Sequence, residues 1–310
     1  MYPKAPFWVQ YASFINDLDD VVDLVEGFVF KFADDTKYGR SIIDDTDRKK
    51  MQSDIDKLLQ WAETWQMAFN AKKCKVMHFG RSNPGFTYTM GGYAPAGTIL
   101  EAIEEEKDIG VMIHQSLKPS SQCFKAASKA SQVLGQMRRS FQYRDKYVWI
   151  HLYKTYVRHH LEVSCQAWSP WLKRDIEILE RVQRRAVNLV VGLKGESYEE
   201  KLREVGLLSL YDRRRRGDVI QVWKALNGLS IINSEMFQHV DTINSRVTRC
   251  TSKPLNLVKP VGKKEIRTNF FSLRVINEWN KLPTKIQCAS TLSEFKRGYD
   301  KLVHNIIWKS

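Results

Sequence analysis

The sequence predicts an α+β fold, in which a mixed front part is followed by a mainly helical remainder. Two observations lead to this prediction. Up to about residue 115, short apolar segments with strand-like alternation surround one segment of helical periodicity. From Ser120 onward the apolar residues recur at helical spacing in almost every segment. The chain of 310 residues is 43% hydrophobic, so it can form two modest cores or one large core.

The front part is expected to contain a small antiparallel sheet with helical cover. Phe28, Phe30 and Phe32 alternate along residues 27–32, which predicts a strand with these rings on one face. Apolar residues at helical spacing predict a helix over residues 52–69. Further short strands are expected at residues 75–79, 86–90 and 107–113, with Gly91-Gly92 as a turn after the second.

The remainder is expected to be helical, with one irregular segment. Ser209 with Asp212 three residues later is typical of a helix N-terminus, and Gly192 and Gly228 stand where helices should end. Helices are expected over residues 120–140, 146–162, 174–191 and 209–227, a loop or linker over 233–269, and one or two closing helices over 270–308 around Pro283.

Positive charge is concentrated in the helical part. Residues 1–110 hold 13 Lys and Arg against 18 Asp and Glu, whereas residues 111–310 hold 36 against 17. Such an asymmetry favours a polyanionic partner, and the alternative is a solvated helical domain with many surface cations.

Several other classes of protein are disfavoured by the sequence. No run of about 18 apolar residues occurs, so a membrane span is not expected. Residues 1–6 begin no signal peptide, and the five cysteines form no cluster of zinc-ligand spacing. We therefore expect a nuclear or cytoplasmic protein with reduced thiols that is not secreted.

The sharpest local feature is the tetrapeptide Phe32-Ala33-Asp34-Asp35. It follows one apolar strand and precedes a second possible strand at residues 36–38, which predicts a strand–turn–strand unit with two carboxylates at its tip. Polymerases place carboxylates in this way because Mg²⁺ prefers hard oxygen ligands and two metal ions drive phosphoryl transfer. An ordinary solvated acidic turn is the alternative.

Further motifs stand around this tetrapeptide in a fixed order. Before it lies Phe14-Ile-Asn-Asp-Leu18; after it come Trp61-Ala-Glu-Thr-Trp65, Phe69-Asn70, Lys73-Cys74, Val76-Met-His-Phe-Gly80, Lys107-Asp-Ile-Gly-Val111, Gln166-Ala-Trp-Ser-Pro170, Glu180-Arg-Val-Gln-Arg-Arg-Ala186, Arg215-Arg-Gly-Asp218, Phe270-Phe-Ser-Leu-Arg-Val275 and Trp279-Asn-Lys-Leu-Pro283. In order and spacing this set resembles the reverse transcriptase of non-LTR retrotransposons of the jockey-like LINE kind. The resemblance covers about residues 13–300.

The resemblance implies roles for particular residues. Asp34 would be the principal metal ligand in an RNA-directed DNA polymerase site that uses Mg²⁺, and Asp35 would assist it. Asn70 and Lys73 match the next palm motif, whose lysine lies near the incoming nucleotide. Lys107 and Ile109-Gly110-Val111 match the primer grip. RNA and DNA, as template and primer, would be the partners.

The resemblance also implies a division of the chain into segments. These are an unrelated start at residues 1–12, a partial palm at 13–115, a helical thumb or connection region at 116–232, a loop or linker at 233–269 and a C-terminal helical segment at 270–310. A palm that lacks one strand would leave an apolar face and a sheet edge uncovered, so self-association is expected there.

The sequence departs from the family upstream of the acidic tetrapeptide. Only 33 residues precede Asp34, so the fingers and the first metal-binding aspartate of the family are expected to be absent. Asp17, Asp19 and Asp20 are not expected to replace that aspartate. Because phosphoryl transfer depends on positioned charge, the chain alone is expected to be inactive as a truncated reverse transcriptase. The alternatives are an incomplete stretch of an active enzyme and a non-catalytic nucleic-acid-binding protein.

Two arginine clusters are candidates for phosphate contact. Arg181, Arg184 and Arg185 lie opposite an apolar helix stripe, although Glu177 and Glu180 could pair with Arg181 and Arg184 along the helix. The run Arg213, Arg214, Arg215 and Arg216 covers all sides of a helix, so part of it must face solvent or a partner, and arginine suits phosphate. The tryptophans at helical spacing are expected in cores.

Overall fold

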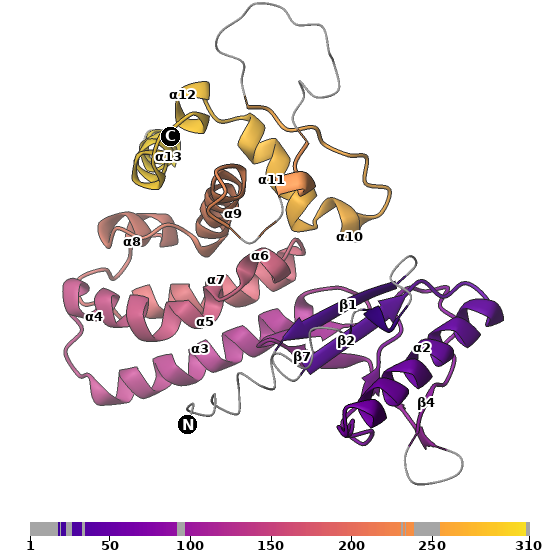
Figure 1. Cartoon of the computed structure of the whole chain (residues 1–310). Coiled ribbons are helices and arrows are strands. Elements are labelled where there is room, and N and C mark those ends of the chain that lie inside the picture. The colour runs from indigo at the N-terminus through magenta and orange to yellow at the C-terminus, as the bar shows by residue number, and fades with distance from the viewer. Residues whose placement is uncertain are drawn as a thin grey trace, which may run out of the picture. The chain divides into compact units, whose positions relative to one another are not determined.

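The computed structural model describes residues 18, 20–22, 27–32, 35–91, 97–230, 232, 234–238 and 255–307. The chain divides into two compact units, Met1–Glu106 with His114–Ser116 and Lys107–Ile113 with Leu117–Ser310. The fold is α+β, with small antiparallel sheets and a majority of helix (Figure 1). The coarse fold class predicted from the sequence is therefore confirmed.

The first unit is built on a hairpin and one long helix. Strand β1 (Gly27–Phe32) pairs antiparallel with β2 (Asp35–Arg40), and helix α2 (Asp45–Thr64) follows. The remaining strands are two residues long: β3 (Lys75–Val76) pairs parallel with β6 (Glu101–Ala102), and β4 (Thr89–Met90) pairs antiparallel with β5 (Thr98–Ile99).

Helix α2 holds the hairpin through apolar and polar contacts. Leu58 and Trp61 form a buried cluster against which Val29 of β1 and Tyr38 of β2 pack. Asp54 on the same helix is buried, and its carboxylate accepts hydrogen bonds from the Tyr38 hydroxyl and from the Arg40 guanidinium, the latter at 2.8 Å. The orientation of the acidic hairpin is therefore fixed from the side that faces α2.

The predicted helix over residues 52–69 is present with different ends. It begins at Asp45 because Asp44 caps it by accepting a hydrogen bond from the Asp47 amide, and its first turn is charged rather than apolar. It stops at Thr64 because Gln66 takes a left-handed backbone conformation, with φ of 54°. Trp65 is exposed, so its predicted core position is wrong.

The later strands of the first unit are shorter than predicted. The strands predicted at residues 75–79 and 86–90 are reduced to β3 and β4, because their partners β6 and β5 are also only two residues long. The single strand predicted at 107–113 is wrong. The segment is instead a hairpin of β7 (Glu105–Asp108) and β8 (Val111–His114), joined by Ile109-Gly110.

The second unit consists of helices. Their bounds are α3 (Ser120–Ser140), α4 (Lys146–Leu152), the π-helical turn η2 (Tyr153–Val157), α5 (Arg158–Glu162), α6 (Cys165–Trp168), α7 (Lys173–Val187), α8 (Tyr198–Glu204), α9 (Leu210–Leu226), the 3-10 turn η3 (Ser234–Met236), α10 (Glu265–Thr268), α11 (Phe271–Asn280), α12 (Thr284–Gln287) and α13 (Leu292–Ile307). Helices α3 and α7 pack against each other along their length, and α9 packs against both α11 and α13 (Figure 1).

Two large apolar clusters stabilise this unit. The first joins α3, the α4–η2–α5 segment and α7 around Trp149, Tyr153 and Leu179. The second joins α9 to α11 and α13 around Trp223, Trp279 and Phe295. Because α9 shares the second core with the closing helices, residues 117–230 and 270–307 lie in one unit.

The helix predictions for this unit are mostly confirmed. Helices over 120–140 and 209–227 are present, and Ser209 caps α9 by accepting a hydrogen bond from the Asp212 amide at 3.0 Å. The helix predicted over 174–191 ends one turn early, at Val187. The closing segment, predicted as one or two helices, forms three, α11, α12 and α13.

Part of the segment predicted as a loop or linker is packed against the second core. Leu257 is buried, and its amide donates a hydrogen bond to Asn280 Oδ1 of α11 at 2.9 Å. The indole of Trp279 donates to the carbonyl of Leu255 at 2.7 Å. Residues 255–258 are therefore an irregular but integral part of the helical unit, which also contains the short helix α10 inside the predicted linker.

Candidate acidic hairpin and nucleic-acid interface

The two strands predicted on either side of the acidic pair are present. In the β1–β2 register Phe32 pairs with Asp35, so residues 33 and 34 form the connection between the strands. Asp35 is exposed at the first position of β2. Ala33 and Asp34 lie outside the residues that the structure describes.

The strand alternation predicted for β1 has an unexpected orientation. Phe28, Phe30 and Phe32 do share one face, but they are 51%, 62% and 58% exposed. The opposite face carries Val29 and is the one that packs toward α2. The hairpin thus presents an uncovered apolar face beside the acidic connection, as expected of a sheet with a missing neighbour.

Most of the other residues matched to the polymerase site are exposed, but Val111 is buried. Lys73 lies in a turn in which the Asn70 carbonyl accepts hydrogen bonds from the amides of Lys73 and Cys74, at 2.8 and 3.2 Å. Lys107 belongs to β7 and Val111 to β8, so the segment matched to the primer grip is the end of a hairpin.

The connection of that hairpin is strained. Ile109 has φ of 43° and Gly110 has φ of 87°, the pattern of a two-residue turn with both central residues in the left-handed region. Glycine adopts this conformation freely, whereas a β-branched residue such as Ile109 does so at a cost. The Ile109 side chain is 62% exposed, so no burial of that side chain offsets the cost.

The first arginine cluster, on α7, has different partners from those expected. The predicted pairs of Glu177 with Arg181 and of Glu180 with Arg184 are wrong. Glu177 instead accepts a hydrogen bond from Arg184 at 2.6 Å, two turns along the helix. Arg181 is exposed and has no side-chain partner within the described part of the chain, and Arg185 only approaches the Ser131 hydroxyl of α3, at 3.5 Å.

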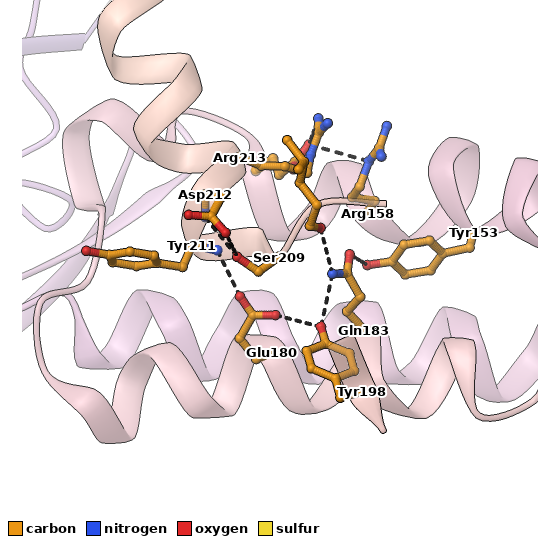
Figure 2. A network of polar contacts seen from close by, with 11 residues as sticks. Tyr153, Arg158, Glu180, Gln183, Tyr198, Ser209, Tyr211, Asp212 and Arg213 are labelled. Atoms are coloured by element: carbon orange, nitrogen blue, oxygen red, sulfur yellow. Dashed lines mark hydrogen bonds and ion pairs between the residues drawn. The ribbon is translucent and has the colours of Figure 1, made fainter. Parts of the chain in front are cut away.

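The second cluster, on α9, is bound largely within the chain; Figure 2 shows its first member, Arg213. Arg213 forms a two-pronged ion pair with Glu162 of α5. Arg215 pairs with Glu278 of α11, and Arg216 donates two hydrogen bonds to Asp300 of α13, at 2.6 and 2.8 Å. Three of the four arginines therefore connect α9 to neighbouring helices.

Arg214, the fourth member of the run, points into the protein. It is 2% exposed, and its two terminal nitrogens have no hydrogen-bond partner among the residues that the structure describes. Burial lowers the pKa of this guanidinium, and the nearby Glu180 carboxylate acts in the opposite direction. Its position in the core argues for a structural role rather than direct contact with phosphate.

Glu180 is the acidic centre of the buried polar network drawn in Figure 2. Its carboxylate accepts hydrogen bonds from the Tyr198 hydroxyl and from the Tyr211 amide, both at 2.8 Å. Burial raises the pKa of Glu180, and these two hydrogen bonds partly oppose the rise. The network joins α7, α8 and the start of α9.

Segments that carried the family resemblance meet in a second buried contact. Arg274 of α11 donates hydrogen bonds to both carboxylate oxygens of Asp218, at 2.8 and 3.0 Å, and to the carbonyl of Gln166 at 2.9 Å. Burial raises the pKa of Asp218, while the hydrogen bond from Arg274 lowers it. These motif residues hold the helical unit together.

The cysteines on the described residues are consistent with reduced thiols. Cys74, Cys123, Cys165 and Cys288 are free. Burial raises the pKa of Cys123 to about 12 and that of Cys165 to about 11, which makes both thiols poor nucleophiles. Cys250 lies outside the described residues.

Comparisons with known proteins add no family assignment. No protein-family model, no curated protein and no solved structure matches this chain. Among the residues that the structure describes, no three His, Cys, Asp or Glu side chains are grouped as metal ligands, and no helix is long and apolar enough to cross a membrane.

Proposed function

We propose that this chain is a reverse-transcriptase-like nucleic-acid-binding protein that contains part of a polymerase palm and thumb, and that residues 1–310 alone do not polymerise DNA. The observation that carries the proposal is the β1–β2 register, which leaves Ala33-Asp34 as the connection of an antiparallel hairpin directly before Asp35. Antiparallel strands on either side of the acidic pair are the arrangement that the resemblance to non-LTR retrotransposon enzymes implies for a metal site.

The acidic pair fits the proposed chemistry in ligand type. Carboxylate oxygens are the donors that Mg²⁺ prefers, and Asp35 is exposed on a hairpin held by α2. Bound Mg²⁺ would neutralise charge on a phosphoryl group during transfer. Family members use a further aspartate for this purpose, and the resemblance identifies no counterpart of it in these residues. We therefore infer binding of template and primer without synthesis.

Primer extension on an RNA template tests the catalytic part of this proposal. We expect no Mg²⁺-dependent extension by the folded chain and no difference between the unmodified chain and the Asp34→Ala variant. Glu63→Gln is a matched control, because Glu63 is an exposed carboxylate on α2 with no side-chain partner in the described part of the chain. Extension that is lost in Asp34→Ala but kept in Glu63→Gln would contradict the inferred inactivity.

The second candidate is a non-catalytic nucleic-acid-binding protein whose acidic hairpin binds no metal. The charge distribution favours it, since residues 111–310 hold 36 Lys and Arg against 17 Asp and Glu. On this reading the acidic hairpin has no role, so Asp34→Ala and Asp35→Ala would leave Mg²⁺ affinity unchanged. Under the first proposal, both variants weaken Mg²⁺ binding in isothermal titration calorimetry.

A further inference from the structure

Three cations lie close together where α5 meets α9, and two of them contact the same carboxylate. Arg158 Nε lies 3.6 Å from Glu162 Oε2 on the same helix, and the Arg213 guanidinium binds both oxygens of Glu162 from α9 (Figure 2). Lys154 lies one helical turn before Arg158. It is exposed and forms no hydrogen bond or ion pair with the residues that the structure describes. The cluster therefore carries three positive charges against one negative charge.

Burial and the neighbouring positive charges lower the pKa of two members of the cluster. Partial burial lowers the pKa of Lys154, and the nearby positive charges of Arg158 and Arg213 lower it further. The pKa of Arg158 is also lowered, first by burial and then by Arg213, with Glu162 acting in the opposite direction. Such crowding destabilises the charged forms, and an anion bound among these groups would relieve it.

The backbone beneath the cluster is held by buried contacts. Lys154 belongs to the π-helical turn η2, a form that often occurs at functional sites. In the same turn, the fully buried Tyr153 donates a hydrogen bond from its hydroxyl to Gln183 Oε1 at 2.8 Å. Gln183 Nε2 donates in turn to the Tyr198 hydroxyl and to the Leu208 carbonyl, each at 3.0 Å (Figure 2). These buried hydrogen bonds fix the backbone of the turn that carries Lys154.

We propose that Lys154, Arg158 and Arg213 form a binding subsite for a phosphate group. Glu162 occupies the paired donors of Arg213, so Arg213 contributes mainly charge, while the ammonium of Lys154 and the guanidinium of Arg158 provide donors to the phosphate oxygens. The assignment of this phosphate to a polynucleotide backbone rests on the proposed function. A free phosphate ion has the same chemistry.

Binding of a fluorescently labelled single-stranded RNA oligonucleotide, followed by anisotropy over a range of salt concentrations, tests the subsite. We expect Lys154→Gln to weaken binding about 3- to 10-fold and to reduce the slope of log affinity against log salt by about 1. Lys154→Arg keeps the charge and should retain binding. Lys285→Gln removes the same charge from an exposed lysine of α12, outside the cluster, and should have a smaller effect.

A second arm measures thermal stabilisation of the same four proteins by inorganic phosphate. If Lys154→Gln weakens RNA binding more than Lys285→Gln, the subsite holds a polynucleotide phosphate. If RNA binding is equal in these variants but phosphate stabilises the chain only when residue 154 is positive, the ligand is a free phosphate. If neither RNA affinity nor stabilisation by phosphate depends on the charge at residue 154, the subsite is overturned. The proposed function still stands in that case if the chain binds RNA. If no protein binds RNA, the proposed function fails, and the phosphate arm alone decides the subsite.

Discussion

Buried charges at single positions determine how the helical unit responds to mutation. Arg274 and Asp218 have few exposed atoms, and their pairing also involves the Gln166 carbonyl. Removal of one member of such a pair leaves the other charge buried without compensation, which costs more than the pair itself contributes. The contact therefore matters mainly through the penalty of breaking it.

We predict that Arg274→Met lowers the free energy of unfolding by about 3 kcal/mol, because it leaves the Asp218 carboxylate buried and unpaired. Arg184→Met is the control, since the Arg184–Glu177 pair is much more exposed than the Arg274–Asp218 pair and should contribute about 1 kcal/mol or less. Urea denaturation at neutral pH measures both. Equal losses in the two variants would show that the Arg274 contact is no more important than a surface pair.

Glu180 should make stability depend on pH. Its folded-state pKa is raised above the ordinary value of 4.5, chiefly by burial. A carboxyl group with a raised folded-state pKa binds its proton more tightly when the chain is folded, so it contributes increasing stability as pH falls from neutral toward the ordinary pKa. The sign is opposite to that of a carboxylate whose pKa is lowered by an ion pair.

We predict that the difference in unfolding free energy between the unmodified chain and Glu180→Gln shifts in favour of the unmodified chain as the pH falls from 7 to 5, because the folded state favours the protonated form of Glu180 and glutamine has no such equilibrium. Denaturant titrations at the two pH values measure the shift. A difference that is constant, or that moves in favour of Glu180→Gln at pH 5, would contradict the burial effect.

At the scale of the elements, the turn of the β7–β8 hairpin contains a residue whose backbone conformation is unfavourable for its side chain. Ile109 occupies a left-handed backbone position that asparagine and glycine adopt more readily. We predict that Ile109→Asn raises the free energy of unfolding by about 1 kcal/mol. Ile99→Asn is the control, because Ile99 is an exposed isoleucine in a strand without a positive φ, and it should not stabilise the chain.

A stabilised Ile109→Asn variant with weakened template–primer binding would connect the strained turn to the role that the family resemblance implies for it. If Ile109→Asn is less stable than the unmodified chain in thermal unfolding, then the strain assigned to this turn is wrong.

The β1–β2 hairpin presents a second feature at this scale, its uncovered apolar face. Phe30 and Phe32 are each more than half exposed, and adjacent exposed aromatic rings promote association in water. We predict that the purified chain self-associates and that Phe30→Thr with Phe32→Thr shifts it toward the monomer in light scattering. Phe124→Thr, at an exposed phenylalanine of α3, should leave association unchanged; a monomeric unmodified chain contradicts the prediction.

Local sequence patterns predicted the elements better than their partners. The cap at Ser209 and the strands beside Asp34-Asp35 are encoded by neighbouring residues, so both could be located. The contacts of α9 could not be. Arg216 pairs with Asp300, which is 84 residues away, and nothing in the run of four arginines indicates that acidic partners lie on other helices.

Local patterns also could not predict which face of strand β1 is covered. The alternation of Phe28, Phe30 and Phe32 showed a shared face, but the period alone cannot show which face is covered. The covered face is opposite, because α2 packs on Val29. Lys154 was missed as a candidate because Arg213 lies far along the chain on α9, and the only local signal was one lysine four residues before an arginine.

At the scale of the whole molecule, charge and fold divide the chain at nearly the same place. The first unit contains the acidic hairpin, and the helical unit, which begins near residue 107, holds most of the positive charge. Several of these cations are bound internally, so the net charge overstates the surface that is open to a polyanion. The exposed arginines of α7 and the cluster around Lys154 remain as the candidate contacts.

Equilibrium binding of an RNA–DNA template–primer by the folded chain, measured at a series of salt concentrations, tests the central claim most directly. The account predicts binding whose logarithm falls linearly with the logarithm of salt concentration, because phosphate contacts release counterions. A folded chain that binds no template–primer at low salt, or whose affinity does not change with salt, would contradict the proposed nucleic-acid interface.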